Sequence, residues 1–171
     1  PLFKSPIVWK GKLENGMTVT GIENNEVPLV EFDITIPGGQ LIESIEKAGV
    51  SSLLSDLLMQ GTKTKSAADL EEAIGMLGAS INMYTTNEDF HITGSCLAKN
   101  FEETIALVKE IILEPRWDEK EYNRLKQALE TNLKGREANP NFIASSNFNK
   151  LIYGENHPFG VPTSGNFETV S

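Results

Sequence analysis

The chain has 171 residues, 39% of them hydrophobic and 23% charged, which is enough to bury one core without disulfides. Its 24 acidic and 15 basic residues give a formal net charge of -9, and the basic residues are scattered, so this composition argues against nucleic acid as a partner. The single cysteine, Cys96, excludes a disulfide framework and a cysteine-rich zinc site, and no apolar run approaches the length of a membrane span.

The two ends of the sequence lack the usual features of a complete chain. The first residue is Pro1, without an initiator methionine, and residues 167–171 contain no helix cap or polar tail. No internal repeat or low-complexity linker divides the chain. We therefore expect residues 1–171 to form a single domain that is a fragment of a longer polypeptide.

The first predicted elements are strands. Asn15-Gly16 lies between the apolar and β-branched segments 10–13 and 17–22, and this dipeptide predicts a β-hairpin because both of its residues tolerate positive φ. Apolar and polar residues then alternate through residues 30–36, the pattern of a strand with one buried face. Pro37-Gly38-Gly39 predicts the turn that ends this strand.

A helix is predicted within the stretch from Ala48 to Thr62. Its apolar residues recur at the spacing of one helix face, and they are Val50, Leu53, Leu54, Leu57 and Leu58. Ser52, Ser55 and Asp56 are expected on the opposite side. Small polar side chains at i, i+3 and i+4 can converge on one ligand, so this face is a candidate site.

A second helix and a second hairpin follow. Ser66 and Asp69 have the spacing of a capping box, and Gly78 supplies a stop, which predicts a helix over residues 66–77. Residues 80–86 and 90–96 are predicted to form antiparallel strands. Cys96, in the second of them, is expected to be a buried and inert thiol.

Three further helices are predicted in the last third of the chain. The first is expected to be capped by Asn100 with Glu103, and its inward face to consist of Phe101, Ile105, Val108 and Ile112. The second begins at Asp118 and ends near Ala138, with a stripe of Tyr122, Leu125, Leu129 and Leu133. The third spans residues 141–151. This order lacks regular β-α alternation, so the expected fold class is α+β with a largely antiparallel sheet.

The residues alone indicate no complete active site. The two histidines, His91 and His157, have no second histidine or carboxylate at helical spacing, and we expect them in a strand and a turn, with local hydrogen bonds. No serine lies in a Gly-x-Ser-x-Gly elbow, and Gly38-Gly39 lacks the spacing of a phosphate-binding loop.

Several short segments, in their order and spacing, resemble the pitrilysin/insulinase family of zinc metallopeptidases, which includes the mitochondrial processing peptidase. These segments are residues 13–19 (LENGMTV), 36–39 (IPGG), Ala48-Gly49 followed by Gly61-Thr62, 77–85 (LGASINMYT), 113–117 (LEPRW) and 153–160 (YGENHPFG). The resemblance extends from about Trp9 to Pro162. It implies a half-domain of processing-peptidase type, with helices packed mainly on one face of the sheet.

The resemblance also locates the family's zinc motif, an inverted His-x-x-Glu-His on a helix with a distal glutamate as third ligand. The two histidine positions correspond to Ser52 and Asp56, the glutamate position to Ser55, and the distal glutamate position to Asn132. All four are replaced. The implied domain has no catalytic residue, no metal and no cofactor, and zinc is expected in a partner half.

Family members are built from paired homologous halves or subunits, one of which keeps the fold while its zinc motif degenerates. Residues 124–140 resemble the non-catalytic half. The chain is then the first domain of that half, its partners are a zinc-bearing half and a peptide substrate, and the parent protein is a zinc-dependent metalloendopeptidase. An edge strand that holds peptide is expected at Ile81, Asn82, Met83, Tyr84 and Thr85.

Two alternatives remain open from the sequence. In the first, the chain belongs to a wholly inactive family member, a structural or binding subunit like the core proteins of the respiratory bc1 complex. In the second, Asp56 and Asn132 join His91 around a different metal.

Overall fold

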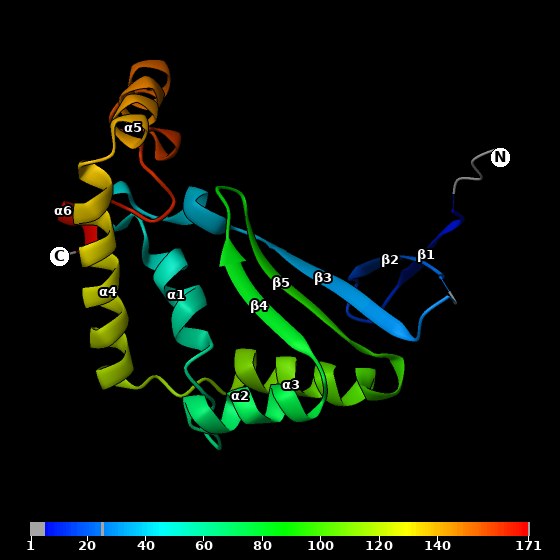
Figure 1. The fold of residues 1–171 in the computed structure, drawn as a ribbon. Helices are drawn as coiled ribbons and strands as arrows, with labels where there is room; N and C mark the ends of the chain where they lie inside the picture. The colour runs from blue at the N-terminus through cyan, green and yellow to red at the C-terminus, as the bar shows by residue number, and fades with distance from the viewer. Residues whose placement is uncertain (1–5, 25, 171) are drawn as a thin grey trace.

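The computed structural model describes residues 6–24 and 26–170, and its strands form two antiparallel sheets (Figure 1). The first sheet is the hairpin of β1 (Val8–Lys12) and β2 (Thr18–Ile22). Between its strands the Leu13 amide donates to the Met17 carbonyl at 2.9 Å, and Gly16 adopts a φ of 88°. The hairpin predicted from Asn15-Gly16 is confirmed.

The second sheet has three strands in the order β3-β5-β4, where β3 is Leu29–Pro37, β4 is Ser80–Thr85 and β5 is Asp89–Leu97. All pairings are antiparallel, and Ile34, Ile92 and Met83 lie in register across the three strands. Among the described residues, β3 and β4 are therefore the edge strands. The predicted strands and the second hairpin are confirmed.

Two short 3-10 helices, η1 (Gly39–Ile42) and η2 (Ile45–Lys47), connect β3 to the first α-helix. The sequence predicted only a turn here. Gly39 adopts a φ of 61°, and a Cβ at this position would lie 2.5 Å from the Thr86 carbonyl oxygen. A glycine is therefore required where this connection passes under the β4–β5 turn.

The helices follow the order expected from the sequence. They are α1 (Val50–Leu58), α2 (Ala67–Met76), η3 (Ala98–Asn100), α3 (Phe101–Leu113), α4 (Glu119–Glu137), α5 (Pro140–Tyr153), η4 (Pro158–Gly160) and α6 (Phe167–Val170). The five longer helices match the five predicted ones, and α6 was not predicted. Within residues 6–24 and 26–170, no helix combines the length and apolar character needed to cross a bilayer.

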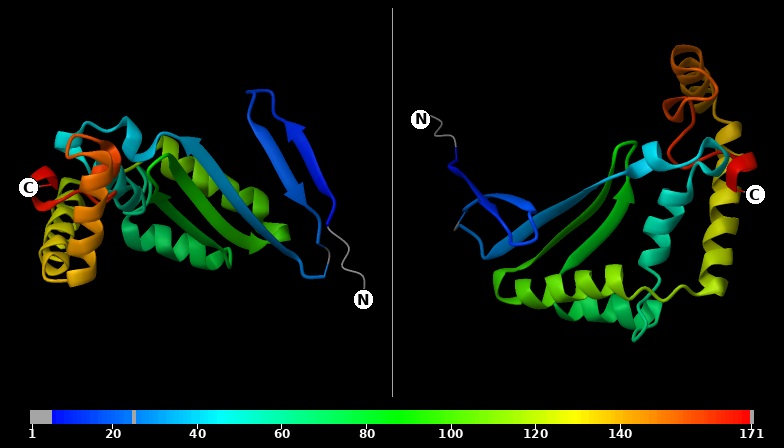
Figure 2. Two further views of the ribbon diagram at one scale, coloured as in Figure 1. Left: turned by 90° about the horizontal axis from the view of Figure 1, so that it is seen from above. Right: turned by 180° about the vertical axis from the view of Figure 1, so that it is seen from behind.

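The core lies between one face of the three-stranded sheet and the helices α1, α2 and α3. Its buried members are Leu58, Leu70, Ile81, Met83, Ile92, Leu107, Val108 and Ile111. Figure 2 shows α2 and α3 side by side under this face, whereas no helix of the described residues covers the opposite face. The expected α+β class, with helices mainly on one face, is confirmed, and Cys96 is buried as predicted.

Local side-chain caps explain where several helices begin. The Asp69 amide donates to the Ser66 hydroxyl at 3.2 Å and the Ser66 amide to the Asp69 carboxylate at 3.0 Å, which confirms the capping box. Asp118 accepts from the amides of Glu121 and Lys120, and these bonds lower the pKa of its carboxyl.

The predicted cap of α3 is wrong. The Asn100 side chain makes no hydrogen bond to the start of its own helix; its amide instead donates to the Leu77 carbonyl at 2.8 Å. Asn100 thereby ties the start of α3 to the end of α2. A tertiary contact has replaced a local one that the sequence pattern favoured.

Some predicted helix faces are also rotated. In α3 the buried residues are Thr104, Leu107, Val108 and Ile111, whereas Phe101, Ile105 and Ile112 are only partly buried. In α1, Val50 is 53% exposed and does not hold the helix to the core as its spacing suggested. Successive residues of a helix are about 100° apart around its axis. The spacing of apolar residues therefore predicts the buried side of a helix only to within about one residue position.

Candidate functional site

The candidate site is built around α1, whose start is fixed by a distant carboxylate. Gly49 precedes the helix with a φ of 103°, and its amide donates to the Glu43 carboxylate at 2.9 Å. The Ser51 amide donates to the other oxygen of the same carboxylate. Negative charge at a helix N-terminus is favourable. Sequence reasoning missed Glu43, because a cap six residues upstream has no fixed local signature.

The three motif positions on α1 do not share one solvent-facing surface. Ser55 is only 2% exposed, Ser52 is partly buried and Asp56 is exposed. The regular helix over Val50–Leu58 keeps Ser52, Ser55 and Asp56 on one side, as their spacing predicted, but this side is not an open polar surface. The helix packs on β4 and also lies beside α4, so Ser55 is enclosed between elements (Figure 1).

A compact group of hydroxyls joins α1 to the end of β4. The Ser55 hydroxyl donates to the Ser51 carbonyl at 2.8 Å and lies 2.9 Å from the Thr85 hydroxyl. The Thr85 hydroxyl also donates to the Ser51 carbonyl, at 3.0 Å. We refer to Ser51, Ser55 and Thr85 as the hydroxyl cluster. The hydroxyls of Ser55 and Thr85 and the Ser51 carbonyl fasten the helix to the edge strand, whereas the buried Ser51 hydroxyl has no hydrogen-bond partner among the described residues.

Asp56 and Asn132 lie on the neighbouring helices α1 and α4. Loss of surrounding water raises the pKa of the Asp56 carboxyl above its usual range. Asn132 is exposed. Just after the end of α1, the Gln60 side chain accepts a hydrogen bond from the Arg124 guanidinium at 2.9 Å, which links this turn to α4.

His91 belongs to a different part of the molecule. It pairs with Tyr84 across β4 and β5, so its side chain lies on the sheet face opposite Thr85 and α1. Its Nδ1 is 3.1 Å from an Asp33 oxygen, and its ring stacks on Tyr84 with centroids 4.9 Å apart. The hypothesis that His91 joins Asp56 and Asn132 around a metal is therefore wrong.

His157 lies at the start of η4, and the Phe159 amide donates to its Nδ1 at 3.2 Å. Its ring packs between Tyr153 and Phe159, with centroids 5.6 and 5.3 Å away. The prediction of a turn histidine with local hydrogen bonds is confirmed.

The donors at the four motif positions do not fit zinc. They comprise two neutral hydroxyls, one carboxylate and one amide, whereas a tight site needs imidazole, thiolate or several carboxylates. The Ser55 hydroxyl is, in addition, engaged within the hydroxyl cluster. Across residues 6–24 and 26–170, no three His, Cys, Asp or Glu side chains gather closely enough to hold a metal ion.

The predicted peptide-holding strand, Ile81–Thr85, lies within the edge strand β4. The Thr86 amide donates to the Asp89 carbonyl, and alternation along an antiparallel pair then assigns the even-numbered residues of β4 to bonds with β5. The main-chain groups of Ile81, Met83 and Thr85 therefore point away from the sheet. The side chains of Ile81 and Met83 enter the core, while Asn82 and Tyr84 lie on the open face.

The insulinase family, peptidase family M16, matches residues 19–159 of this chain. The match covers most of the sequence. The chain belongs to the M16 peptidase family.

Individual relatives carry both peptidase and non-peptidase names. The chain is 27% identical over 158 residues to an uncharacterized zinc protease, YmxG, of Bacillus subtilis, covering 92% of this chain and 38% of that protein. It is 29% identical over 128 residues to the mitochondrial-processing peptidase subunit beta of rat, and the match covers 71% of this chain and 26% of that protein. A relative from Helicobacter pylori is named a non-peptidase homolog. It is 22% identical over 148 residues, and the match covers 86% of this chain and 34% of that protein.

Solved structures show the same fold. The crystal structure of a peptidase M16 inactive domain from Pseudomonas fluorescens superposes with a TM-score of 0.88 at 20% identity, covering 95% of this chain and 40% of that one. The crystal structure of a protease from Helicobacter pylori superposes with a TM-score of 0.85 at 19% identity, covering 97% of this chain and 40% of that one. The chain thus spans about two fifths of the length of these proteins.

Proposed function

We propose that this chain is a catalytically silent domain of an M16 peptidase, and that it forms part of a peptide-enclosing chamber opposite a zinc-bearing half. The proposal rests on one observation, the kind of side chain present at the four motif positions. Ser52, Asp56 and Asn132 supply no imidazole or paired carboxylates, and the base position, Ser55, is buried within the hydroxyl cluster. The fold is kept while the donors that zinc and water activation need are replaced.

The chain is, in this proposal, the first domain of the silent half. The curated relatives and the superposed structures are about two and a half times as long as this chain, which leaves room for a second domain of similar size. Zinc and the catalytic glutamate belong to the homologous half, in the same polypeptide or in a partner subunit. We thus propose both the zinc-bearing partner half and the peptidase activity of the whole protein.

Peptide is held along β4 through main-chain pairing. The amides and carbonyls of Ile81, Met83 and Thr85 point outward from the sheet, and an extended peptide can add to them as a further strand. Their side chains are turned away from such a peptide, so this contact selects for extended shape and little for sequence. Beyond the end of β4, Glu88 in the β4–β5 turn and Asp89 at the start of β5 border a hollow of about 520 Å³ that also includes Phe159.

The experiment measures binding of a labelled extended peptide together with its singly N-methylated versions. Methylation at alternate peptide amides should abolish binding, because those amides pair with β4, and methylation at the intervening amides should leave it unchanged. Hydrogen exchange should slow at Ile81, Met83 and Thr85 when peptide is added. Equal effects of methylation at every position would contradict the strand-pairing proposal.

The same peptide should remain intact in the presence of this chain alone. Cleavage that survives repurification and is abolished by Asp56→Ala would refute the silent assignment. Asp56 is the one motif position that retains an ionisable group, so it is the residue through which residual activity would act.

A second candidate function is a scaffold in a wholly inactive family member, which the non-peptidase name of the Helicobacter relative favours. The two functions differ in one genetic observation. An intact His-x-x-Glu-His in the same reading frame or a neighbouring gene supports the peptidase chamber. Its absence from both supports the scaffold.

A further inference from the structure

The side of α1 that is turned away from the core carries two polar side chains. Ser55 meets Thr85 at the end of β4, and Leu58, about 60° to one side of Ser55 around the helix axis, lies in the core under the sheet. Ser52 and Asp56 are about 60° and 100° to the other side. These two residues, which we call the motif face of α1, therefore lie beyond the outer edge of β4.

Asp56 supplies the charge of the motif face, and within the described part of the chain no basic side chain pairs with it. Partial burial has removed water from its carboxyl, which raises its pKa. Helix α4 borders α1 in Figure 1, but its Arg124, which donates to Gln60, is already paired with Glu121 at 2.7 Å. A partly desolvated carboxylate without a partner is costly, and a cationic ligand compensates this cost.

A peptide held on β4 would bring every second side chain to the motif face. Cross-strand neighbours in a sheet direct their side chains to the same face. Peptide residues opposite Ile81, Met83 and Thr85 therefore point to the helix side of the sheet, where α1 packs on β4. The intervening peptide residues lie on the open face, beside Asn82 and Tyr84. Selection among peptide sequences would then come from α1, whereas pairing with β4 selects only an extended shape.

We propose that the motif face of α1 binds a basic side chain, Lys or Arg, of the peptide that β4 holds, and that the Asp56 carboxylate is its counter-ion. The inference rests on the proposed function, because that function supplies the peptide. The Ser52 hydroxyl is a further acceptor for the donors of such a side chain. The preferred substrates are then extended peptides with a basic residue on the helix side of the added strand.

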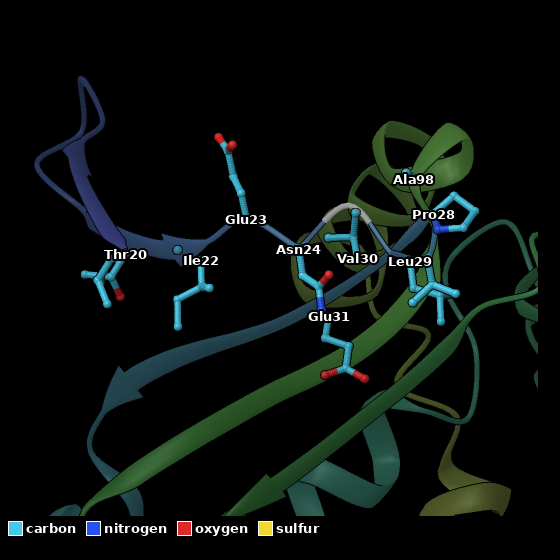
Figure 3. Close-up of a pocket in the computed structure, with 12 residues that line it drawn as sticks. Thr20, Ile22, Glu23, Asn24, Pro28, Leu29, Val30, Glu31 and Ala98 are labelled. Carbon is cyan, nitrogen blue, oxygen red and sulfur yellow. The ribbon is translucent and has the colours of Figure 1, made fainter. Parts of the chain in front are cut away.

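Two other acidic positions border hollows of the molecule, and the test must separate them from Asp56. Glu88 borders the hollow of about 520 Å³ beyond the end of β4. Glu31 borders a larger hollow, of about 780 Å³, between the β1–β2 hairpin and β3 (Figure 3). Because β3 and β4 are the opposite edges of the three-stranded sheet, Glu31 is far from a peptide on β4. Glu31 therefore serves as the control, and Glu88 as the competing position.

A lysine scan of an extended peptide tests the proposal on the protein expressed from its complete reading frame, with a chelator present to prevent cleavage. A single Lys is moved one position at a time along the peptide, and Kd is measured for each version. Affinity should alternate and be about tenfold higher where Lys is on the helix side. Replacing that Lys with norleucine, an uncharged side chain of similar length, should remove the gain. Equal affinity at every Lys position would overturn the proposal.

Three variants of the complete protein identify the counter-ion. Asp56→Asn should abolish the alternation, because it keeps the shape of the side chain and removes its charge. Glu88→Gln and Glu31→Gln should leave the alternation unchanged. Alternation that is lost in Glu88→Gln and kept in Asp56→Asn would overturn the proposal and place the basic side chain beyond the end of β4. Loss in all three variants would also overturn it, since only the net charge of the protein would then matter.

Hydrogen exchange with the same peptides separates this inference from the proposed function. Slower exchange at Ile81, Met83 and Thr85 reports pairing with β4, whatever the position of Lys. Slower exchange there without alternation of affinity would refute binding at the motif face and leave peptide holding by β4 in place. Binding that leaves these three amides unprotected, or no binding at all, would refute both.

Discussion

The hydroxyl oxygens of Ser55 and Thr85 lie 2.9 Å apart, between the helix and the edge strand that carry the proposed site. The family resemblance assigns Ser55 to the position of the catalytic glutamate, and Thr85 ends the strand proposed to hold peptide. The position that would activate water is thus used to fix the edge strand to the helix. The hydroxyl cluster is a structural contact where the sequence resemblance places chemistry.

Ser55→Ala should lower the free energy of unfolding by about 1 kcal/mol, because it removes the hydroxyl that donates to the Ser51 carbonyl and the contact of that hydroxyl with Thr85. Ser52→Ala, at a partly buried position on the same helix, should change it by less than about 0.5 kcal/mol. Urea denaturation of both variants checks the prediction. A larger loss for Ser52→Ala would argue against a stabilising role for the cluster.

The assignment of the zinc-motif positions can be tested by restoring zinc ligands at three of them. Ser52→His, Asp56→His and Asn132→Glu together should bind one zinc ion per chain, because imidazoles at i and i+4 on α1 would face a carboxylate from α4. The control replaces Asn132→Glu with Thr131→Glu, a neighbouring exposed position on α4. Equilibrium dialysis measures the bound metal. Equal zinc binding by the two triple variants would show that the assignment of Asn132 is wrong.

Glu110 should control stability in acid. Its carboxylate accepts from the hydroxyls of Thr62 and Thr64, both at 2.6 Å, and from the Lys65 ammonium at 2.8 Å. The hydrogen bonds from Lys65 and the two threonines lower the pKa of Glu110 to about 2 from 4.5. Because the folded-state pKa is the lower one, its stabilising contribution is complete above pH 4.5 and is lost as the pH falls towards 2.

Glu110→Gln should therefore lower stability at pH 7 by about 1 kcal/mol and flatten the decline between pH 4.5 and 2. Glu103→Gln, an exposed first-turn position of the same helix, should leave the decline unchanged. Urea midpoints measured across this pH range check both variants. An equally steep decline in Glu110→Gln would assign the acid sensitivity to other groups.

The sequence predicted those features that depend on neighbours in the chain. Asn15-Gly16 specifies its hairpin and Ser66 with Asp69 specifies a helix start, because the groups that interact are within three residues of each other. The order of elements, and hence the α+β class, followed from these signals. The four motif positions came from the family resemblance, and they remain predictions.

Long-range contacts account for what the sequence did not show. Asn100 bonds to Leu77 instead of capping its own helix, and Glu43 caps α1 from six residues upstream. The spacing of Ser55 made it part of a candidate ligand site, but its side chain is buried and its hydroxyl meets that of Thr85, thirty residues away. Each error has the same cause, since a partner supplied by the tertiary fold overrode the local preference of the residue.

Two glycines should respond in opposite directions to the same substitution. Gly49→Ala should lower the free energy of unfolding by about 2 kcal/mol or more, because Gly49 has a φ of 103° and a Cβ there would lie 2.7 Å from the Ser164 carbonyl oxygen. Gly75→Ala, inside α2 with open space around its Cα, should raise it by about 0.5 to 1 kcal/mol. Thermal and urea denaturation measure both. A neutral Gly49→Ala would show that the approach of residues 164–165 to the start of α1 is looser than the structure has it, and that Glu43 alone holds the site helix in place.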